Sequence, residues 1–123
     1  MSSAMPSHQS DIPARFDAAL ERLGGDVVLF RDMAEIFIED LPLLIADMAP
    51  LWDQPEQWHE LSRAVHRLKG MVVTFDDNLA GPLQQLITAT HDGDQQTVRV
   101  LRYELQEEIN QLYRQLIRLV AKA

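Results

Sequence analysis

The 123-residue sequence predicts an all-α fold, an antiparallel up-and-down four-helix bundle with a short extra helix at its N-terminal end. Apolar residues recur at steps of three and four along four long segments, and no segment alternates apolar and polar residues as a strand does. The connections between these segments are short, which makes neighbouring helices antiparallel. The chain is long enough for one domain with a core and too short for two.

The first residues differ in composition from the rest of the chain. Residues 1–13 are rich in Ser and Pro and can bury little surface, so we expect a flexible polar arm in front of a single domain over 14–123. Apolar residues at helical spacing then predict a short helix that ends at the Gly24-Gly25 pair, because glycine tolerates a left-handed turn. Asp26 is expected to cap the helix that follows.

The second and third helices carry the clearest apolar stripes. One is predicted over 30–48, and Pro42 inside it predicts a kink or a break, because proline lacks the N–H group and crowds the preceding turn. The other is expected to begin at Pro55, a residue suited to the first helical turn. We expect it to end at the polar cluster 76–78.

Two further helices complete the predicted bundle. The fourth segment starts near Leu79, where Pro82 fits only in a first turn, and it ends at Gly93. Asp94 is then expected to cap the last helix, whose apolar stripe runs from Val98 to Val120.

Charge and composition exclude several functions. The net charge is −8 and the isoelectric point near 4.8, which argues against a nucleic-acid partner, because phosphate binding needs a basic face. The absence of cysteine excludes disulfides, thiol catalysis and thiolate metal sites. The N-terminal residues include no apolar stretch for a signal peptide or membrane helix, so we expect no membrane association and a cytoplasmic location.

Chemistry-bearing residues gather on one face of the third predicted helix. Its apolar stripe lies opposite His66, so this histidine is expected to face solvent. Residues three, four and seven positions apart share a helix face, and they extend this exposed band. The other members of the band are His59, Ser62, Lys69, Gly70 and Val73.

Gly70 is unusual in this band, because glycine inside a helix costs about 1 kcal/mol relative to alanine. The missing side chain would let another protein or a phosphoryl group approach the imidazole one turn earlier. The charges nearby are also unusual: over 59–70, Arg63, Arg67 and Lys69 against one glutamate give a net charge of +2, so the rest of the chain carries −10. This cationic setting suits a phosphorylated histidine or an acidic partner surface.

The run His66-Arg67-Leu68-Lys69-Gly70 on a helix resembles the core motif of histidine-containing phosphotransfer (HPt) domains of multi-step phosphorelays. The stretches 23–26 and 37–42 also look like this family, and the resemblance covers about residues 15 to 120. It implies that the histidine takes a phosphoryl group from an aspartyl phosphate on one receiver domain and passes it to another. His66 would be the nucleophile and Lys69 a neighbour of the phosphoryl oxygens.

The resemblance also implies the partners. These would be response-regulator receiver domains and a hybrid sensor kinase, with Mg²⁺ supplied by the receiver and no cofactor on this chain, which we expect to be a monomer. No glycine-rich phosphate loop is present, so the protein is expected to be a phosphocarrier without autokinase activity. The sequence departs from the family pattern between Met71 and Asp77, where Val73 is expected to form an apolar part of the receiver contact.

Two other functions compete with this interpretation. A helical adaptor would bind a receiver or another signalling protein and transfer nothing, and the intact histidine, lysine and glycine of the motif weigh against it. A metal site would need inward-facing Glu-x-x-His pairs, as some helical bundles have. Glu56 and His59 have that spacing, but they face outward in the helical projection and no second pair exists, so we expect no metal.

Overall fold

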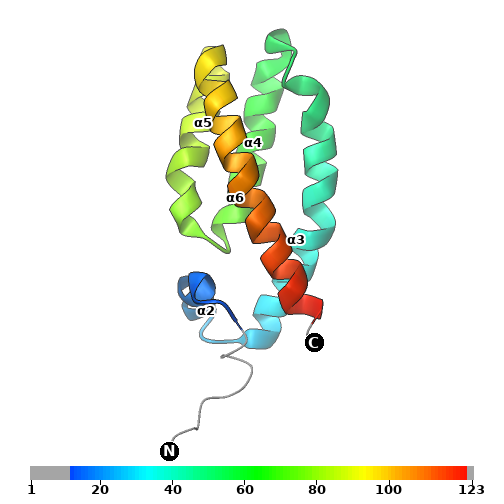
Figure 1. The fold of residues 1–123 in the computed structure, drawn as a ribbon, viewed down its shortest axis with the longest axis vertical. Coiled ribbons are helices and arrows are strands. Elements are labelled where there is room, and N and C mark those ends of the chain that lie inside the picture. Colours follow the sequence, from blue (N-terminus) through cyan, green and yellow to red (C-terminus); the bar gives the residue numbers. More distant parts are fainter. Residues whose placement is uncertain (1–11, 122–123) are drawn as a thin grey trace, which may run out of the picture.

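The computed structural model describes residues 12–121, and within them it contains five α-helices and no strand (Figure 1). The short α2 precedes four long helices, and α3 and α5 each pack against both α4 and α6, so that the long helices close into a bundle. The predicted fold class is confirmed. The helices are α2 (Asp17–Arg22), α3 (Val27–Met48), α4 (Trp58–Val73), α5 (Ala80–Asp92) and α6 (Gln95–Ala121).

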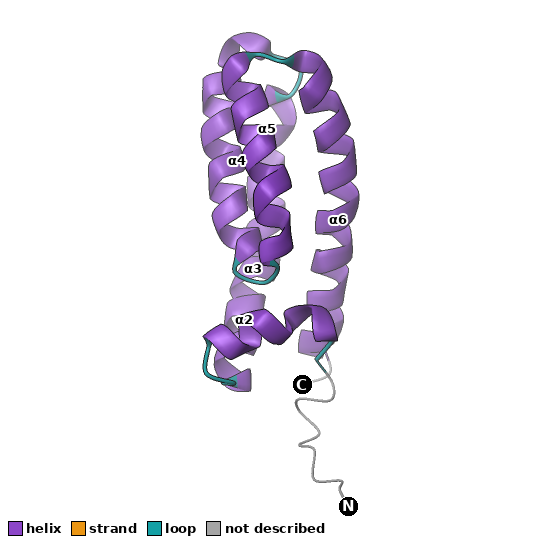
Figure 2. Cartoon of the chain, turned by 90° about the vertical axis from the view of Figure 1, so that its left-hand side faces the viewer, coloured by secondary structure: helices purple, strands orange, loops and turns teal. Residues whose placement is uncertain are grey.

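The lead-in segment, which comprises the 3₁₀ turn Ala14–Phe16 and α2, lies across one end of the bundle (Figure 2). Phe16 is completely buried, and Ile12 is buried with 8% of its surface exposed. The predicted arm over 1–13 therefore extends too far, because Ile12 packs in the core; residues 1–11 lie outside the described residues.

A glycine turn reverses the chain between α2 and α3. Gly24 and Gly25 have φ angles of +68° and +78°, a region that glycine enters without steric cost, as predicted. The side chain of Asp26 then caps α3, accepting a hydrogen bond from the backbone N–H of Leu29 at 3.0 Å. This turn fixes where α2 lies against the bundle.

α3 continues through Pro42, so of the two predicted alternatives, a kink or a break, the break is wrong. Proline removes the hydrogen bond to the carbonyl of Ile38, four residues earlier. Pro42 lies on an exposed part of the helix, where water can replace that bond. Burial of Phe37, Leu41 and Leu44 on the inner face holds the helix on both sides of the proline.

Four phenylalanine rings pack together at the end of the bundle that the lead-in segment covers. Phe30 lies 5.5 Å from both Phe16 and Phe75, and Phe37 lies 5.3 Å from Phe75, measured between ring centroids. Edge-on aromatic pairs contribute about 1 kcal/mol each beyond their buried area. The cluster fixes the lead-in segment and the end of α4 against α3.

The remaining helix ends follow the predicted residues closely. A 3₁₀ turn, Pro55–Gln57, precedes α4, so the α-helix begins three residues later than expected, and it ends at Val73 rather than at the polar cluster. Gly93 ends α5 in the left-handed conformation. Asp94 caps α6 through a hydrogen bond from the backbone N–H of Thr97 at 3.2 Å.

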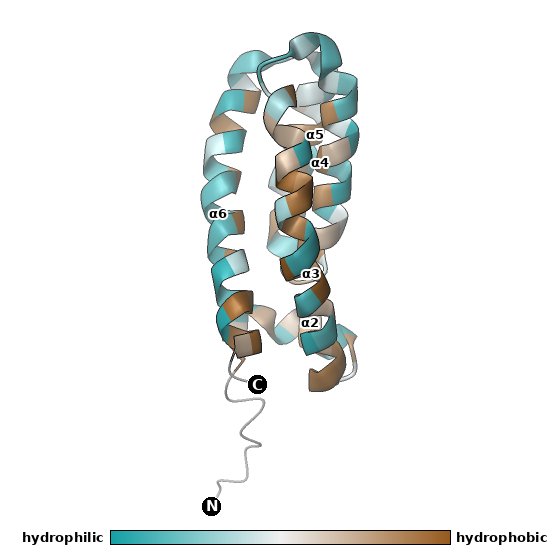
Figure 3. Cartoon of the chain, turned by 90° about the vertical axis from the view of Figure 1, so that its right-hand side faces the viewer, coloured by the Kyte–Doolittle hydropathy of each residue, from teal (hydrophilic) through white to brown (hydrophobic). Residues whose placement is uncertain are grey.

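The core is continuous along the bundle, and polar residues cover much of the outer face of α6 (Figure 3). Every helix contributes buried apolar side chains, and in the four long helices these recur at helical spacing. No helix among residues 12–121 has the length and apolar composition needed to cross a membrane.

Candidate functional site

The position of His66 follows from the apolar stripe of α4. Leu61, Val65, Leu68 and Val72 are all buried, and they lie on one face of the helix at steps of three and four residues. His66 projects from another face and is exposed, as the sequence predicts. Burial of the stripe therefore orients the imidazole toward solvent.

An open hollow of about 510 Å³ surrounds this histidine. The structure brings together His66, Lys69, Gly70 and Val73 of the predicted band in its wall. Three residues from outside α4 complete the lining. These further residues are Arg22, Thr74 and Asp77.

Lys69 is half-buried, whereas the sequence predicts an exposed position. Its Nζ donates a hydrogen bond to Oε1 of Gln84 on α5 at 2.9 Å, because the close packing of α4 and α5 brings the amide within reach. The amide is a neutral acceptor, so the ammonium charge is not paired by this contact. Lys69 is thus positioned at the hollow with its charge available to an anion.

The N-terminal part of the predicted band lies apart from the hollow. Ser62 is half-buried rather than exposed, and its Oγ lies 3.5 Å from the backbone carbonyl of Ile87, because α5 covers this side of α4. His59 is exposed, about 10 Å from His66 along the helix axis at 1.5 Å per residue. Neither Ser62 nor His59 lines the hollow around His66.

Arg63 and Arg67 are exposed on α4 and do not line the hollow either. They stand beside it on the same helix, where their charges act at longer range and are screened by salt. Of the three basic residues counted over 59–70, the lysine therefore lies in the hollow and the two arginines lie beside it.

Gly70 leaves open space next to His66. A Cβ atom built at this position would meet no other part of the molecule within 4 Å. The fold therefore does not require glycine here, although glycine weakens the helix by about 1 kcal/mol relative to alanine. This supports the inference that the missing side chain serves the approach of another molecule.

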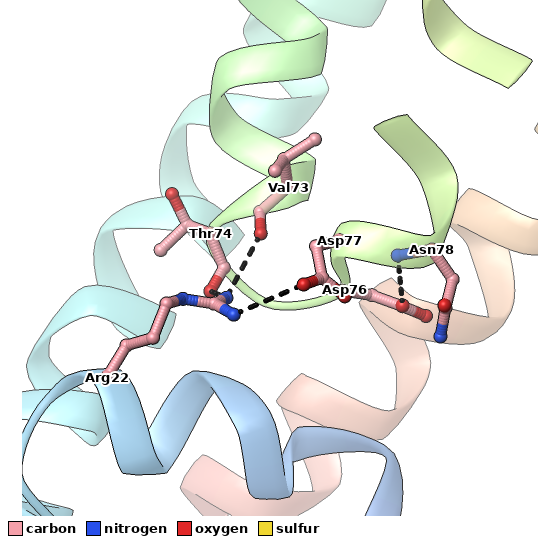
Figure 4. A network of polar contacts seen from close by, with 6 residues as sticks. All are labelled: Arg22, Val73, Thr74, Asp76, Asp77 and Asn78. Carbon is pink, nitrogen blue, oxygen red and sulfur yellow. Dashed lines mark hydrogen bonds and ion pairs between the residues drawn. The ribbon is translucent and has the colours of Figure 1, made fainter. Parts of the chain in front are cut away.

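Arg22 is a site residue that the sequence analysis missed. It is the last residue of α2, and its guanidinium extends to the end of α4 (Figure 4). Nη2 donates to the carbonyls of Val73 and Thr74 at 3.4 and 3.1 Å, and Nη1 lies 3.4 Å from Oδ2 of Asp77. No short-range pattern in the sequence connects residue 22 to residues 73–77, so only the fold reveals this neighbour of His66.

The acidic pair after α4 has two separate roles. Asp76 is buried, pairs with Arg15 at 2.6 Å, and accepts a hydrogen bond from the backbone N–H of Asn78 at 3.1 Å. Asp77 is exposed and lines the hollow. The stretch from Met71 to Asp77, where the sequence departs from the HPt pattern, therefore includes an anchor to the lead-in segment and part of the wall of the site.

The two residues considered for a metal site do not line the hollow. Among residues 12–121, no group of three or more His, Asp or Glu side chains is placed to hold a metal ion. Glu56 lies in the 3₁₀ turn before α4, and both Glu56 and His59 are exposed. The hollow itself has a histidine, two basic residues, an open glycine and one carboxylate, a set that suits binding of an anion.

Fold and site together define a helical bundle that presents one exposed histidine beside a lysine and a glycine. The model of the Hpt domain family matches residues 32–116, and the chain belongs to this family. A comparison with curated proteins and one with solved structures gave no match.

Membership of the family gives the chain a phosphotransfer role in a phosphorelay. Hpt domains interact with receiver domains, and they are phosphocarriers rather than enzymes. The matched residues include all of α4 and most of α3 and α6, and they leave out α2.

Proposed function

We propose that His66 is the phosphorylated residue of this Hpt domain, accepting a phosphoryl group from the aspartyl phosphate of one receiver domain and passing it to another. The observation that carries this proposal is the position of His66, exposed in an open hollow beside Lys69 and Gly70. Transfer between two proteins needs a nucleophile that a second protein can reach, and His66 meets that condition.

The chemistry requires little more from this chain. The unprotonated ring nitrogen attacks phosphorus, forming the N–P bond, while the P–O bond to the receiver aspartate breaks and the carboxylate leaves with the electron pair. The proton on the other ring nitrogen stays in place. Phosphoryl transfer depends mainly on positioning and charge neutralisation, which Lys69 supplies at the edge of the hollow. The reverse attack by a receiver aspartate completes the relay.

An apolar surface beside the hollow suits the receiver. A second hollow of about 190 Å³ lies between α3 and α4 and shares Thr74 with the first. Ile36 in its wall is 59% exposed, so the second hollow offers an accessible apolar side chain next to the first. We assign this surface, together with Val73, to receiver docking around His66.

The remaining partners follow from the same role. A hybrid sensor kinase would load the first receiver, and Mg²⁺ would belong to the receiver's aspartate site, so this chain needs no cofactor and no ATP site. We place the protein in the cytoplasm, where such receivers work, as a monomer. The net charge of −8 argues against a nucleic-acid partner.

Label transfer tests the proposal directly. A receiver charged with radiolabelled acetyl phosphate should pass label to the wild type and to His59→Gln, but not to His66→Gln. His59 is a matched control, because it is another exposed histidine of α4 outside the hollow. Transfer of label from the receiver to His66→Gln would overturn the assignment of His66 as the phosphorylated residue. Binding of receivers without transfer in the wild type would instead support the helical adaptor.

A further inference from the structure

Arg22 is held at the edge of the His66 hollow by contacts of which two are long. Its guanidinium lies 3.4 Å from the Asp77 carboxylate, where such charged bonds are normally 2.7 to 2.9 Å. Its bonds to the carbonyls of Thr74 and Val73 measure 3.1 and 3.4 Å, and only the first is within the ordinary range of 2.7 to 3.2 Å. Its side chain is also 46% exposed. The guanidinium is therefore restrained weakly and can exchange its partners at little cost.

A second arginine of the lead-in segment gives the contrast. Arg15 pairs with Asp76 at 2.6 Å, donates to Gln115 at 2.8 Å, and has a side chain only 21% exposed. Arg15 and Arg22 thus face neighbouring aspartates after α4, and one is fixed while the other is loosely held. Arg15 firmly anchors the lead-in segment to this loop, whereas Arg22 lies loosely held at the rim of the hollow.

Lys69 alone does not supply enough positive charge in the hollow to balance a phosphoryl group on His66. Lys69 and Arg22 are the basic residues among its lining, and Asp77 is the acidic one. A phosphohistidine carries close to two negative charges near pH 7, which Asp77 opposes and which Lys69 alone cannot balance. A guanidinium can bind two phosphoryl oxygens at once, which an ammonium group does less well.

We propose that Arg22 is a phosphoryl-binding residue of this site. When His66 is phosphorylated, the guanidinium leaves the carbonyls of Val73 and Thr74 and binds the phosphoryl oxygens across the hollow. Before phosphorylation, Asp77 and these carbonyls keep it at the rim. This inference rests on the proposed role of His66 and adds a residue from another helix to it.

The test uses the full chain, phosphorylated with potassium phosphoramidate so that no receiver is needed. With ¹⁵N-labelled arginine, the guanidinium resonance of Arg22, assigned by its loss in Arg22→Lys, should shift on phosphorylation and return after hydrolysis. The ³¹P resonance of the phosphohistidine should differ between the wild type and Arg22→Gln. These spectra report contact with the phosphoryl group, which a purely structural arginine would not affect.

A transfer equilibrium gives the size of the effect. With a phosphorylated receiver as donor, Arg22→Gln should lower the equilibrium constant for transfer to His66 by roughly five-fold. This is the largest effect expected from losing one exposed charge pair. Arg22→Lys should recover part of the loss. Arg99→Gln removes the same charge at an exposed position of α6 outside the hollow and should change nothing.

The outcomes separate this inference from the proposed function. Phosphorylated His66 with an unchanged Arg22 resonance would overturn the role of Arg22 and leave that of His66 intact. Failure of wild-type His66 to take phosphate from either phosphoramidate or a receiver would overturn both. Because the resonance of Arg22 is read in the wild type, loss of stability in Arg22→Gln cannot hide the result.

Discussion

Nη2 of Arg15 lies 2.6 Å from Oδ2 of Asp76, and this ion pair connects the lead-in segment to the loop after α4. Arg15 also donates to Gln115 on α6, so one side chain joins three separate parts of the chain. Asp77, the next residue in the loop, lines the His66 hollow. An interaction outside the site therefore determines where part of its wall lies.

Arg15→Ala should lower the free energy of unfolding by about 2 kcal/mol, because it leaves the buried Asp76 carboxylate with only the backbone N–H of Asn78. Urea unfolding followed by circular dichroism measures this loss. Arg114→Ala, at an exposed position of α6, should change stability by less than about 0.5 kcal/mol. Equal stability of the two variants would show that the ion pair contributes nothing net.

Gly70→Ala should separate stability from function. The free energy of unfolding should rise by about 1 kcal/mol, because alanine is the better helix former and its Cβ meets nothing within 4 Å. Transfer from a receiver should become slower by roughly ten-fold, as expected when a methyl group crowds a close contact at a cost of about 1.4 kcal/mol. Thermal unfolding and a timed label-transfer assay measure the two effects.

Gly81→Ala is the control for this pair of effects. Gly81 lies in α5, its added Cβ would also meet nothing within 4 Å, and it does not line the His66 hollow. Its transfer rate should equal that of the wild type. Undiminished transfer in Gly70→Ala would mean that no partner approaches the histidine over this glycine.

Charged residues in the proposed docking surface should weaken binding of the receiver. Val73→Asp and Ile36→Asp should each lower affinity by roughly ten-fold or more in calorimetric titrations, because each places a carboxylate in an apolar contact. Val100→Asp makes the same change at a 52% exposed position of α6 and should leave affinity unchanged. Equal affinity of all three variants would place the receiver elsewhere.

The cap of α6 should make part of the stability depend on pH. The hydroxyl of Thr97, and then its backbone N–H, donate to Asp94 and hold the pKa of that carboxyl below its ordinary value of 3.8. A lowered pKa in the folded state stabilises the protein fully above 3.8, and this contribution is lost as the pH falls through the folded-state pKa.

Thr97→Val removes the hydroxyl and should raise the pKa of Asp94 toward 3.8. The variant should be less stable than the wild type near pH 6, and the difference should shrink as the pH falls below 3.8, in urea unfolding followed across this range. Thr88→Val, at an exposed threonine of α5, controls for loss of a hydroxyl. A difference independent of pH would contradict the assigned cause.

The sequence was sufficient to predict the helices and the exposure of His66, because both depend on local periodicity. The buried stripe of α4 determines its outer face whatever packs around it. The Asp26 and Asp94 caps are local for the same reason, since each side chain bonds a backbone N–H three residues later.

The sequence could not predict the surroundings of residues that lie where one helix packs against another. Ser62, Lys69 and Val73 were expected on an exposed face, but all three are half-buried. α5 packs close enough to cover Ser62 and to offer Gln84 to Lys69. The guanidinium of Arg22 lies against the end of α4 at Val73. Arg22 reaches the site through the tertiary position of α2, which no spacing in the sequence encodes. The break that Pro42 left open does not occur, because water can replace the lost hydrogen bond at this exposed position.

The position of Phe16 bears on how this protein can be cut for experiments. The family pattern spans 32–116, yet the ring of Phe16 is completely buried against that of Phe30, and both lie outside this span. A fragment trimmed to the pattern would expose the ring of Phe75 and lose Arg22 as well. The minimal folding unit is therefore larger than the family signature, and expression boundaries should include Ile12 and the whole lead-in segment.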